Sequence, residues 1–492
     1  MNTEWTYMTA ADLVQGIKSG SISSRALLEH SIARMEEKNQ SINAIVSTDL
    51  VAARKLADEA DEKAQQDVDL GPLHGLPITV KDTYEVPGMT CVAGAPEYRY
   101  HRPTAPAITV KRLQDAGAII YGKTNVPYMA SDLQSFNKVF GTTNNPWNID
   151  LTPGGSSGGA AAALASGFTA LELGSDLAGS IRIPAHYCGV YGHKPTQNII
   201  SLQGHVPGPP GSQREPSALA VAGPMARSAS DLELMLDVLL GPSPDMEAGW
   251  RVSLPECSKQ NLSDFKVLLW MDDELCPIDP ALQALYLDVA DKLEAKGVVV
   301  ERSNPPEFCL EDLYPHYLGQ LGAMIGVPQP LLLRRGMALL GFLARLVESF
   351  INVPRHFSHF LLGANMSYAI HQQREERIAR IRKKFLQTFA EYDVILMPPT
   401  PTTAHRHEQL ANMSKRKIAV GHEQRSYTDL FMWISPVSLL GLPATSAPVG
   451  MTSNNLPANL QIVGAPFQDK LTIRFAELLA EITGGFKAPP GF

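Results

Sequence analysis

The chain has 492 residues, of which 44% are hydrophobic and 19% charged, the balance of a soluble globular protein with a large core. Its net charge of −8 gives no reason to expect a nucleic-acid partner. The sequence lacks an apolar stretch long enough to span a membrane and has no signal-peptide pattern over residues 1–9. Five scattered cysteines without a C-x-x-C pair indicate free thiols, so we expect a cytoplasmic protein.

The predicted elements begin with helices and then alternate between strands and helices. Thr9 to Asp12 resembles a capping box before the first helix. A second capping box is predicted at Ser230 to Glu233, with Gly241 closing that helix. Strands are predicted at 76–80, 118–121, 170–173, 267–271, 298–300 and 394–397, and helices at 49–65, 105–117, 279–296 and 366–391. This order predicts an α/β fold with a central mixed, mostly parallel β-sheet flanked by helices. Because no repeat or linker is apparent, we expect one domain over 1–492.

Residues 310–366 differ from the rest because leucine and other large apolar residues are dense there and broken mainly by arginine. The simplest interpretation is a set of helices packed on the core. The alternatives are a hydrophobic substrate tunnel, a dimer surface or a membrane-facing patch. We expect this variable, mainly helical region to shape the substrate site.

The densest chemical signal is the run of small residues from Gly154 to Gly159. An Ala-rich helix follows it directly, which argues against a flexible linker. Its G-x-S-x-G spacing around Ser156 matches the nucleophile elbow of α/β-hydrolases, but the preceding residues 145–153 make a poor strand. The segment also lacks the lysine of a phosphate-binding loop.

Residues 154–195 resemble the signature stretch of the amidase signature family. Ser156 and Ser180 are 24 residues apart, which is the family's spacing for its two working serines. Upstream, Gly75 to Asp82 resembles the segment that supplies the family's lysine. The resemblance covers about residues 8–480 and is weakest over 310–366. Further matching segments are Gly122 to Asn125, Gly141 to Trp147, Gly223 to Ser228, Tyr392 to Pro401, Gly441 to Pro443 and Leu460 to Gly464.

The resemblance implies a catalytic triad of Lys81 as general base, Ser156 as proton relay and Ser180 as nucleophile. Lysine can act as a base only when it is neutral, so its pKa must fall from about 10.4, as burial allows. The family also has a cis peptide bond before the residue that matches Ser156. Amide hydrolysis would then proceed through an acyl-serine intermediate on Ser180.

The resemblance places the oxyanion hole in the loop before the nucleophile. Its donors would be the backbone N–H groups of Leu177, Ala178, Gly179 and Ser180. The family usually has Gly-Gly where this chain has Ala178-Gly179, so the extra methyl group is expected to alter the pocket. Ser157, Asp176 and Arg182 are expected to support the loop without taking part in the chemistry.

No metal or organic cofactor is expected. His405, His407 and Glu408 lie in a Thr/Pro-containing loop without the spacing of a metalloprotease motif. The expected partner is a small-molecule amide with an apolar or aryl group, with esters as side substrates. Neither nucleic acid nor a membrane span is expected, and a homodimer stays possible.

Three other functions remain open. One is the A subunit of a tRNA-dependent amidotransferase, although that protein carries Asp-Gln where this chain has Ala220-Val221 before Gly223-Pro224. Another is an α/β-hydrolase esterase that pairs Ser156 with a later histidine, such as His193 or His422. The last is an inactive binding protein, which the intact lysine and serines disfavour.

Overall fold

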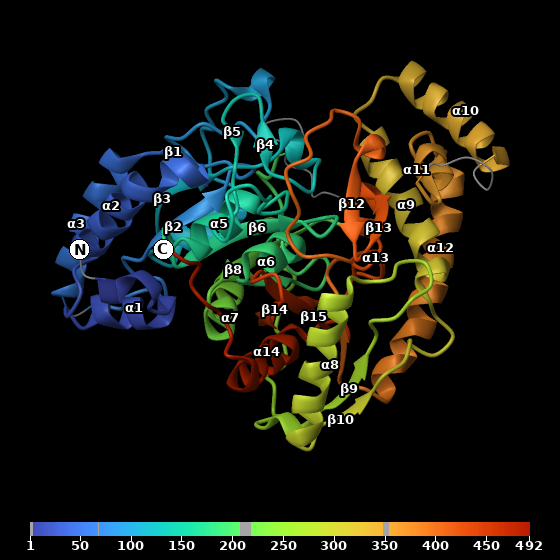
Figure 1. Cartoon of the computed structure of the whole chain (residues 1–492). Coiled ribbons are helices and arrows are strands. Elements are labelled where there is room, and N and C mark those ends of the chain that lie inside the picture. The colour runs from blue at the N-terminus through green and yellow to red at the C-terminus, as the bar shows by residue number, and fades with distance from the viewer. Residues whose placement is uncertain (1–2, 67, 207–217, 348–353) are drawn as a thin grey trace.

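The computed structural model describes residues 3–66, 68–206, 218–347 and 354–492. Figure 1 shows one large twisted sheet through the middle of the molecule with helices on both of its faces. Its strand order within the described residues is β1-β3-β2-β6-β8-β7-β14-β15-β11-β9-β10. The mixed sheet expected from the sequence is therefore confirmed, and it joins strands from both ends of the chain. The strands are β1 (Ile45–Thr48), β2 (Pro77–Lys81), β3 (Ile119–Thr124), β6 (Leu171–Asp176), β7 (Tyr191–Lys194), β8 (Val221–Ala226), β9 (Lys266–Leu269), β10 (Val299–Glu301), β11 (Val394–Met397), β14 (Ala444–Met451) and β15 (Pro457–Val463).

Parallel pairing occurs in two blocks of this sheet. One block is β3-β2-β6 and the other is β11-β9-β10. The described strands between and beside these blocks pair antiparallel. Parallel strands are covered on both faces, and β2 accordingly has all five residues buried. Two small hairpins lie outside the sheet: β4 (Phe136–Asn137) with β5 (Gly141–Thr142), and β12 (Lys417–Val420) with β13 (Glu423–Ser426).

The helices of the first 240 residues pack against the first block of the sheet and against the antiparallel strands beside it. The N-cap at Thr9 is confirmed, because its side chain accepts a hydrogen bond from the Asp12 N–H. The second predicted cap is two residues too late, because Ser228 caps that helix by accepting from the Asp231 N–H. These helices are α1 (Ala10–Lys18), α2 (Ser24–Ile42), α3 (Leu50–Ala64), α4 (Ile108–Asp115), α5 (Gly158–Ala165), α6 (Arg182–Cys188) and α7 (Ala229–Leu239).

The small residues of α5 allow this helix to lie against the neighbouring chain. A Cβ atom on Gly159 would lie 2.4 Å from the backbone nitrogen of Asn125, which directly follows β3. All eight residues of α5 are buried. Glycine at this position therefore permits a close approach that a side chain would prevent, and it holds the start of α5 beside the ends of β2 and β3.

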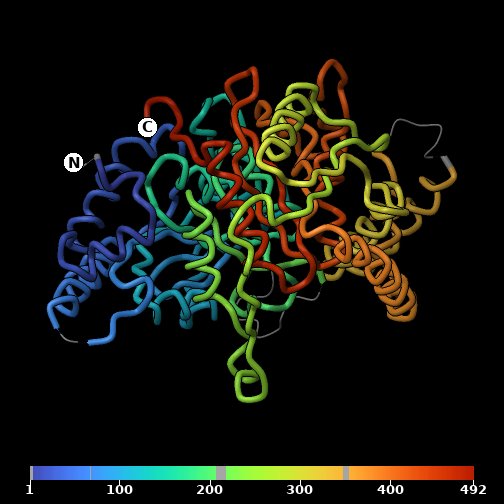
Figure 2. The backbone as a smooth tube through the Cα atoms, turned by 90° about the horizontal axis from the view of Figure 1, so that it is seen from below, coloured from blue at the N-terminus to red at the C-terminus, as the bar shows by residue number. Residues whose placement is uncertain are grey.

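The helices of residues 310–385 extend the molecule away from the N-terminal helices (Figure 2). The region that was expected to pack on the core divides into two parts. The first helix does so, with Leu310, Leu313 and Tyr317 fully buried. The second helix, α10, instead exposes most of its leucines, and residues 348–353 lie outside the described residues. These helices are α8 (Pro280–Ala295), α9 (Leu310–Gly326), α10 (Leu331–Val347), α11 (Phe357–Gly363), α12 (Tyr368–Phe385), α13 (Ser435–Leu439) and α14 (Asp469–Thr483).

Candidate active site

Lys81 is the last residue of β2, one residue beyond the predicted strand, and its side chain is fully buried. Its Nζ lies 2.7 Å from Ser156 Oγ. The same nitrogen lies 2.9 Å from Ser175 Oγ and 3.3 Å from the Ser175 carbonyl oxygen. A buried amine with three hydroxyl or carbonyl neighbours is well placed to exchange a proton with one of them.

Burial lowers the pKa of Lys81 to about 7, against the opposing effect of the carboxylates of Asp176 and Glu172. A substantial fraction of this amine is therefore neutral near pH 7. Glu172 lies on β6 opposite Thr79 of β2, and burial raises the pKa of its carboxyl to about 8. The two shifts bring an amine and a carboxylic acid in one buried region to similar pKa values, a pattern that is common in active sites.

Ser156 lies in the glycine-rich loop that leads into α5, and the Gly155–Ser156 peptide bond is cis. The loop is held from one side by Ser135, whose hydroxyl donates to the Gly154 carbonyl oxygen at 3.1 Å. A Cβ atom on Gly155 would lie 2.6 Å from the Gln134 backbone nitrogen. Glycine at this position thus allows a second chain segment to pack directly on the loop.

Ser180 lies in the loop between β6 and α6 and is 6% exposed. Asp176 and Arg182 form a buried ion pair at 3.0 Å across this loop. Burial alone would raise the pKa of Asp176, but Arg182 beside it lowers that pKa to about 2. Arg182 also donates to the Ile434 carbonyl oxygen and to Ser438 and Gln461. The pair therefore ties the loop to elements from the end of the chain.

The N–H groups of the 177–180 loop have different partners. The Gly179 N–H, one of the predicted oxyanion donors, donates to Asp176 Oδ1 at 2.9 Å and therefore already has a hydrogen-bond partner. Leu177 and Ala178 are partly exposed, at the solvent-accessible edge of the loop. Gly179 has φ +88°, and a Cβ atom there would lie 2.7 Å from Ile183 Cδ1. Glycine is required at this turn, whereas the alanine before it is accommodated.

Ser157 connects the two serine loops. Its N–H donates to the Ser180 carbonyl oxygen at 3.1 Å. Its hydroxyl donates to the Ser175 carbonyl oxygen at 3.3 Å, and that oxygen also neighbours Lys81 Nζ. The structure therefore brings Lys81 to Ser156 directly and brings the main chain of Ser180 to the residue after Ser156.

Two residues that the sequence interpretation missed belong to the same network. Ser175 Oγ lies between Lys81 Nζ and His205 Nε2, at 2.9 Å from each. His205 also packs edge-on against the Tyr84 ring, with ring centroids 4.8 Å apart. Burial lowers the pKa of His205 to about 3, and the nearby Lys81 lowers it further, so the imidazole is neutral. Ser175 adjoins Asp176 in the signature stretch, but no local pattern marks His205.

The structure gives no support to the α/β-hydrolase interpretation. In the described chain from 143 to 155 no strand precedes Ser156; only isolated bridges occur there, at Asn145, Asn148 and Leu151. The ring nitrogens of His193 contact Thr445 Oγ1 at 2.9 Å and Asp469 Oδ1 at 3.1 Å. His422 is exposed in the turn between β12 and β13. The partner of Ser156 is Lys81.

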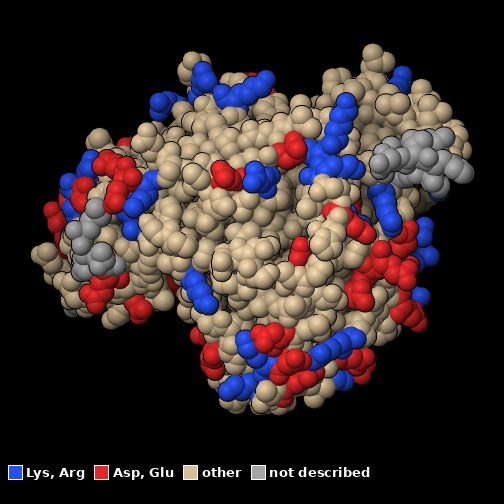
Figure 3. All heavy atoms as spheres, in the orientation of Figure 1, with Lys and Arg blue, Asp and Glu red and all other residues tan. Residues whose placement is uncertain are grey.

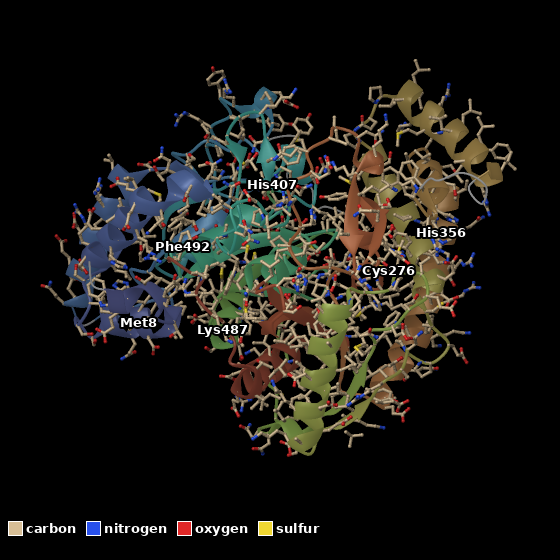
Figure 4. All side chains as sticks on the ribbon, in the orientation of Figure 1. Met8, Cys276, His356, His407, Lys487 and Phe492 are labelled. Carbon is tan, nitrogen blue, oxygen red and sulfur yellow. The ribbon has the colours of Figure 1, made fainter. Side chains whose placement is uncertain are left out.

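The histidine-containing loop 405–408 lies beside the β4–β5 hairpin, where Figure 4 labels His407. Gln409, which follows the loop, donates to Thr142 Oγ1 of β5 at 2.9 Å. Within the described ranges, no three His, Cys, Asp or Glu side chains are grouped to hold a metal ion. The described helices likewise include none long and apolar enough to cross a membrane.

Comparison with known proteins connects this geometry to a family. The model of the family "Amidase" matches residues 26–473. The A subunit of a glutamyl-tRNA(Gln) amidotransferase from Synechococcus sp. (strain CC9605) is 30% identical, with 98% of each chain covered. A solved amidase structure is 26% identical at a TM-score of 0.75, covering 96% of this chain and 99% of that one. A bacterial aryl acylamidase of the amidase signature family shares the fold at a TM-score of 0.79, with 23% identity and 97% and 96% coverage. The chain is an enzyme of the amidase signature family.

Proposed function

We propose that this protein hydrolyses the C–N bond of carboxamides through an acyl-serine intermediate. The observation that carries the proposal is the 2.7 Å contact between Ser156 Oγ and the buried Nζ of Lys81, whose pKa falls to about 7. A neutral lysine has two N–H bonds and one lone pair. Its N–H bonds can donate to Ser175 Oγ and the Ser175 carbonyl oxygen, which leaves the lone pair directed at the Ser156 hydroxyl.

For the acylation step we propose the roles that the resemblance to the family implies. Ser180 Oγ attacks the carbonyl carbon, while its proton passes to Ser156 Oγ and the Ser156 proton passes to Lys81 Nζ. The tetrahedral intermediate collapses by breaking the C–N bond. The proton held by Lys81 returns through Ser156 to the departing amine nitrogen, which leaves an ester on Ser180.

Hydrolysis of the ester completes the cycle. Water attacks the ester carbonyl and gives its proton to the same serine–lysine pair. The second intermediate releases the carboxylic acid as Ser180 Oγ recovers a proton. The reaction consumes one water and yields one acid and one amine, and it draws on no group beyond the chain's own residues.

Stabilisation of the two oxyanions is assigned to the backbone N–H groups of Leu177, Ala178 and Ser180. Among the predicted donors we assign Gly179 the smallest contribution to oxyanion binding, because its N–H already donates to Asp176. The partly exposed Leu177 and Ala178 also supply apolar surface at the loop. On this basis we assign an apolar or aryl amide as substrate, with esters as side substrates, and we place 310–366 at the substrate pocket through α9.

The proximity of Tyr317 on α9 to Asp176 supports that assignment. Tyr317 of α9 is fully buried, and its hydroxyl has no hydrogen-bond partner among the described residues. Burial raises the pKa of Tyr317, and the nearby Asp176 raises it further. A buried hydroxyl near the catalytic loop can therefore hydrogen-bond a bound substrate.

We propose further that residues 1–492 form one catalytic domain and that the protein is cytoplasmic.

The second candidate is a component of a tRNA-dependent amidotransferase, which the 30% identity to the A subunit of a glutamyl-tRNA(Gln) amidotransferase favours. Such a component would need partner chains to act on glutamyl-tRNA. The Ala220-Val221 pair, in place of the Asp-Gln expected of that protein, disfavours this function.

The two candidates differ in what the isolated chain can do. We expect the purified chain to hydrolyse a series of acyl anilides, with the faster turnover for longer or aryl acyl groups, and Ser180→Ala to abolish it. Hydrolysis of glutamine but of no anilide would support the amidotransferase instead. Hydrolysis of neither, by a folded chain, would contradict the proposed amidase; an amidotransferase component would be tested together with its partner chains.

A further inference from the structure

The helix α10 presents its apolar side to solvent. Eight of its large apolar side chains are between 49% and 84% exposed: Leu331, Leu332, Leu333, Leu339, Leu340, Phe342, Leu343 and Leu346. Val327, just before the helix, is 74% exposed. A surface helix normally directs such residues into the core. An exposed apolar surface of this density marks a site of interaction.

The opposite side of α10 carries smaller and more polar residues against the protein. Gly341 is buried, and a Cβ atom there would lie 2.9 Å from Leu361 Cβ of α11. Arg334, Met337, Ala338 and Ala344 are only partly exposed on the same side. With 3.6 residues per turn, the eight apolar residues occupy the remaining, outward side. The helix is therefore amphipathic, but its apolar side faces solvent, whereas the apolar side of an ordinary surface helix faces the core.

The outward surface is also basic. Arg335 and Arg345 are exposed on α10, and residues 331–347 contain no acidic residue. Residues 331–347 contain three arginines, in a chain whose net charge is −8. In Figure 3 the upper right part of the molecule, where α10 lies, is mainly tan with some blue. The apolar surface thus has positive charge at its edge.

We propose that α10 lies in the surface of an anionic lipid bilayer, with its leucine side among the acyl chains and its arginines at the headgroups. Helices that lie in the membrane interface combine an apolar side with Lys or Arg and have no need to span the bilayer. Anionic lipids attract such basic segments. The described helices include none that could span a membrane, which agrees with a surface position.

The charge pattern favours lipid over the other occupants. A two-fold contact between copies would bring two basic α10 helices together, with no acidic residue on either helix to offset their arginines. A nucleic acid would match the charge but not the leucines, because nucleic-acid surfaces combine basic groups with aromatic stacking. A lipid surface matches both the apolar and the basic character.

The test is sedimentation of the full chain with sucrose-loaded vesicles of phosphatidylcholine containing about one third phosphatidylserine. We expect wild type to sediment with these vesicles, about tenfold less with phosphatidylcholine alone, and less at high salt. The double variant Leu339→Glu/Leu343→Glu should lose at least about tenfold in vesicle affinity. The control Val51→Glu, which changes an exposed apolar residue on α3, should bind as wild type does.

Thermal unfolding separates lost binding from lost folding. Because both leucines are exposed, the double variant should unfold at the wild-type temperature. Equal vesicle binding by wild type and the double variant would overturn the proposal. So would a dimer of wild type that the same two substitutions dissociate, or salt-sensitive binding to tRNA in place of vesicles.

Discussion

The candidate active site and α10 depart from the usual placement of residues in opposite ways. At the centre, a lysine, two carboxyl groups and an arginine are fully buried: Lys81, Glu172, Asp176 and Arg182. On α10, eight large apolar residues are exposed, while the small residue Gly341 is buried against α11. Each arrangement costs stability, since burying charge and exposing leucine are both unfavourable. Both departures from ordinary packing lie where we propose that the protein binds another molecule.

The difference between the two regions lies in how their members are held. The polar groups of the centre are fixed by one another, as in the contacts of Arg182 with Asp176, Ser438 and Gln461. The outward leucines of α10 are 49–84% exposed, so the described residues cover only part of their surface. Substitutions at the centre should therefore be costly, and substitutions on α10 should leave the free protein unchanged.

The largest effect should come from Lys81. We expect Lys81→Met to lower kcat by about 10⁴-fold or more, because catalytic units that share a proton lose most of their activity when one member is removed. Lys194 is a matched control. It is fully buried, burial lowers its pKa to about 7, and it donates to the Pro195 and Leu442 carbonyl oxygens. Lys194→Met should retain far more activity than Lys81→Met. Equal losses of kcat in two folded variants would contradict the role of Lys81 as general base.

Removing Arg182 should have the largest effect on stability. Arg182→Met leaves Asp176 buried without its cation, which costs about 3–5 kcal/mol in the free energy of unfolding. Arg335→Met on the exposed side of α10 should change it by about 0.5 kcal/mol or less. Urea denaturation of both variants measures the contrast, and equal values would show that the two regions do not differ as described.

The pH dependence of activity should follow Lys81. Because its pKa lies at about 7 and the neutral amine is the base, kcat/KM should fall about tenfold per pH unit below 7 and level off above about pH 8. A rate profile from pH 5 to 9 checks this direction. A profile that is flat over that range, or that falls as pH rises through 7, would rule out a neutral lysine as base.

A smaller effect should follow changes at His205. His205→Ala opens space beside Ser175 and admits water, so burial of Lys81 weakens and its pKa rises toward the ordinary lysine value. The pH midpoint of kcat/KM should then move to higher pH, with a loss of about tenfold at pH 7. His205→Leu, which keeps the site apolar, should shift the midpoint less. Identical profiles for both variants and wild type would remove His205 from the network.

The fold is largely predictable because local patterns and burial agree over most of the chain. The apolar run before Lys81 predicts β2 to within one residue at each end, and the Thr9 cap is confirmed. The cap predicted at Ser230 is two residues late because Ser228 and Ser230 offer the same chemistry, and only the backbone geometry selects Ser228. The outward side of α10 could not be predicted, because its leucine pattern indicates a buried side but does not reveal what covers it.

The candidate site is predictable where its residues lie in the signature stretch. Spacing and resemblance indicate Lys81, Ser156 and Ser180, and the structure places the first two in contact. His205 is not predictable, because it reaches Ser175 through the fold, beside Tyr84, with no local signal. The engagement of the Gly179 N–H by Asp176 is equally hidden, since it depends on the turn that the loop adopts.

The central claim is that Lys81 activates Ser180 through Ser156. Reaction with a fluorophosphonate, followed by mass spectrometry of the modified peptide, tests it most directly. The account predicts that wild type is labelled at Ser180 and that the folded Lys81→Met variant is labelled at a rate lower by orders of magnitude. A label on Ser156 in place of Ser180, or a label on Ser180 that forms as fast without Lys81, would contradict it.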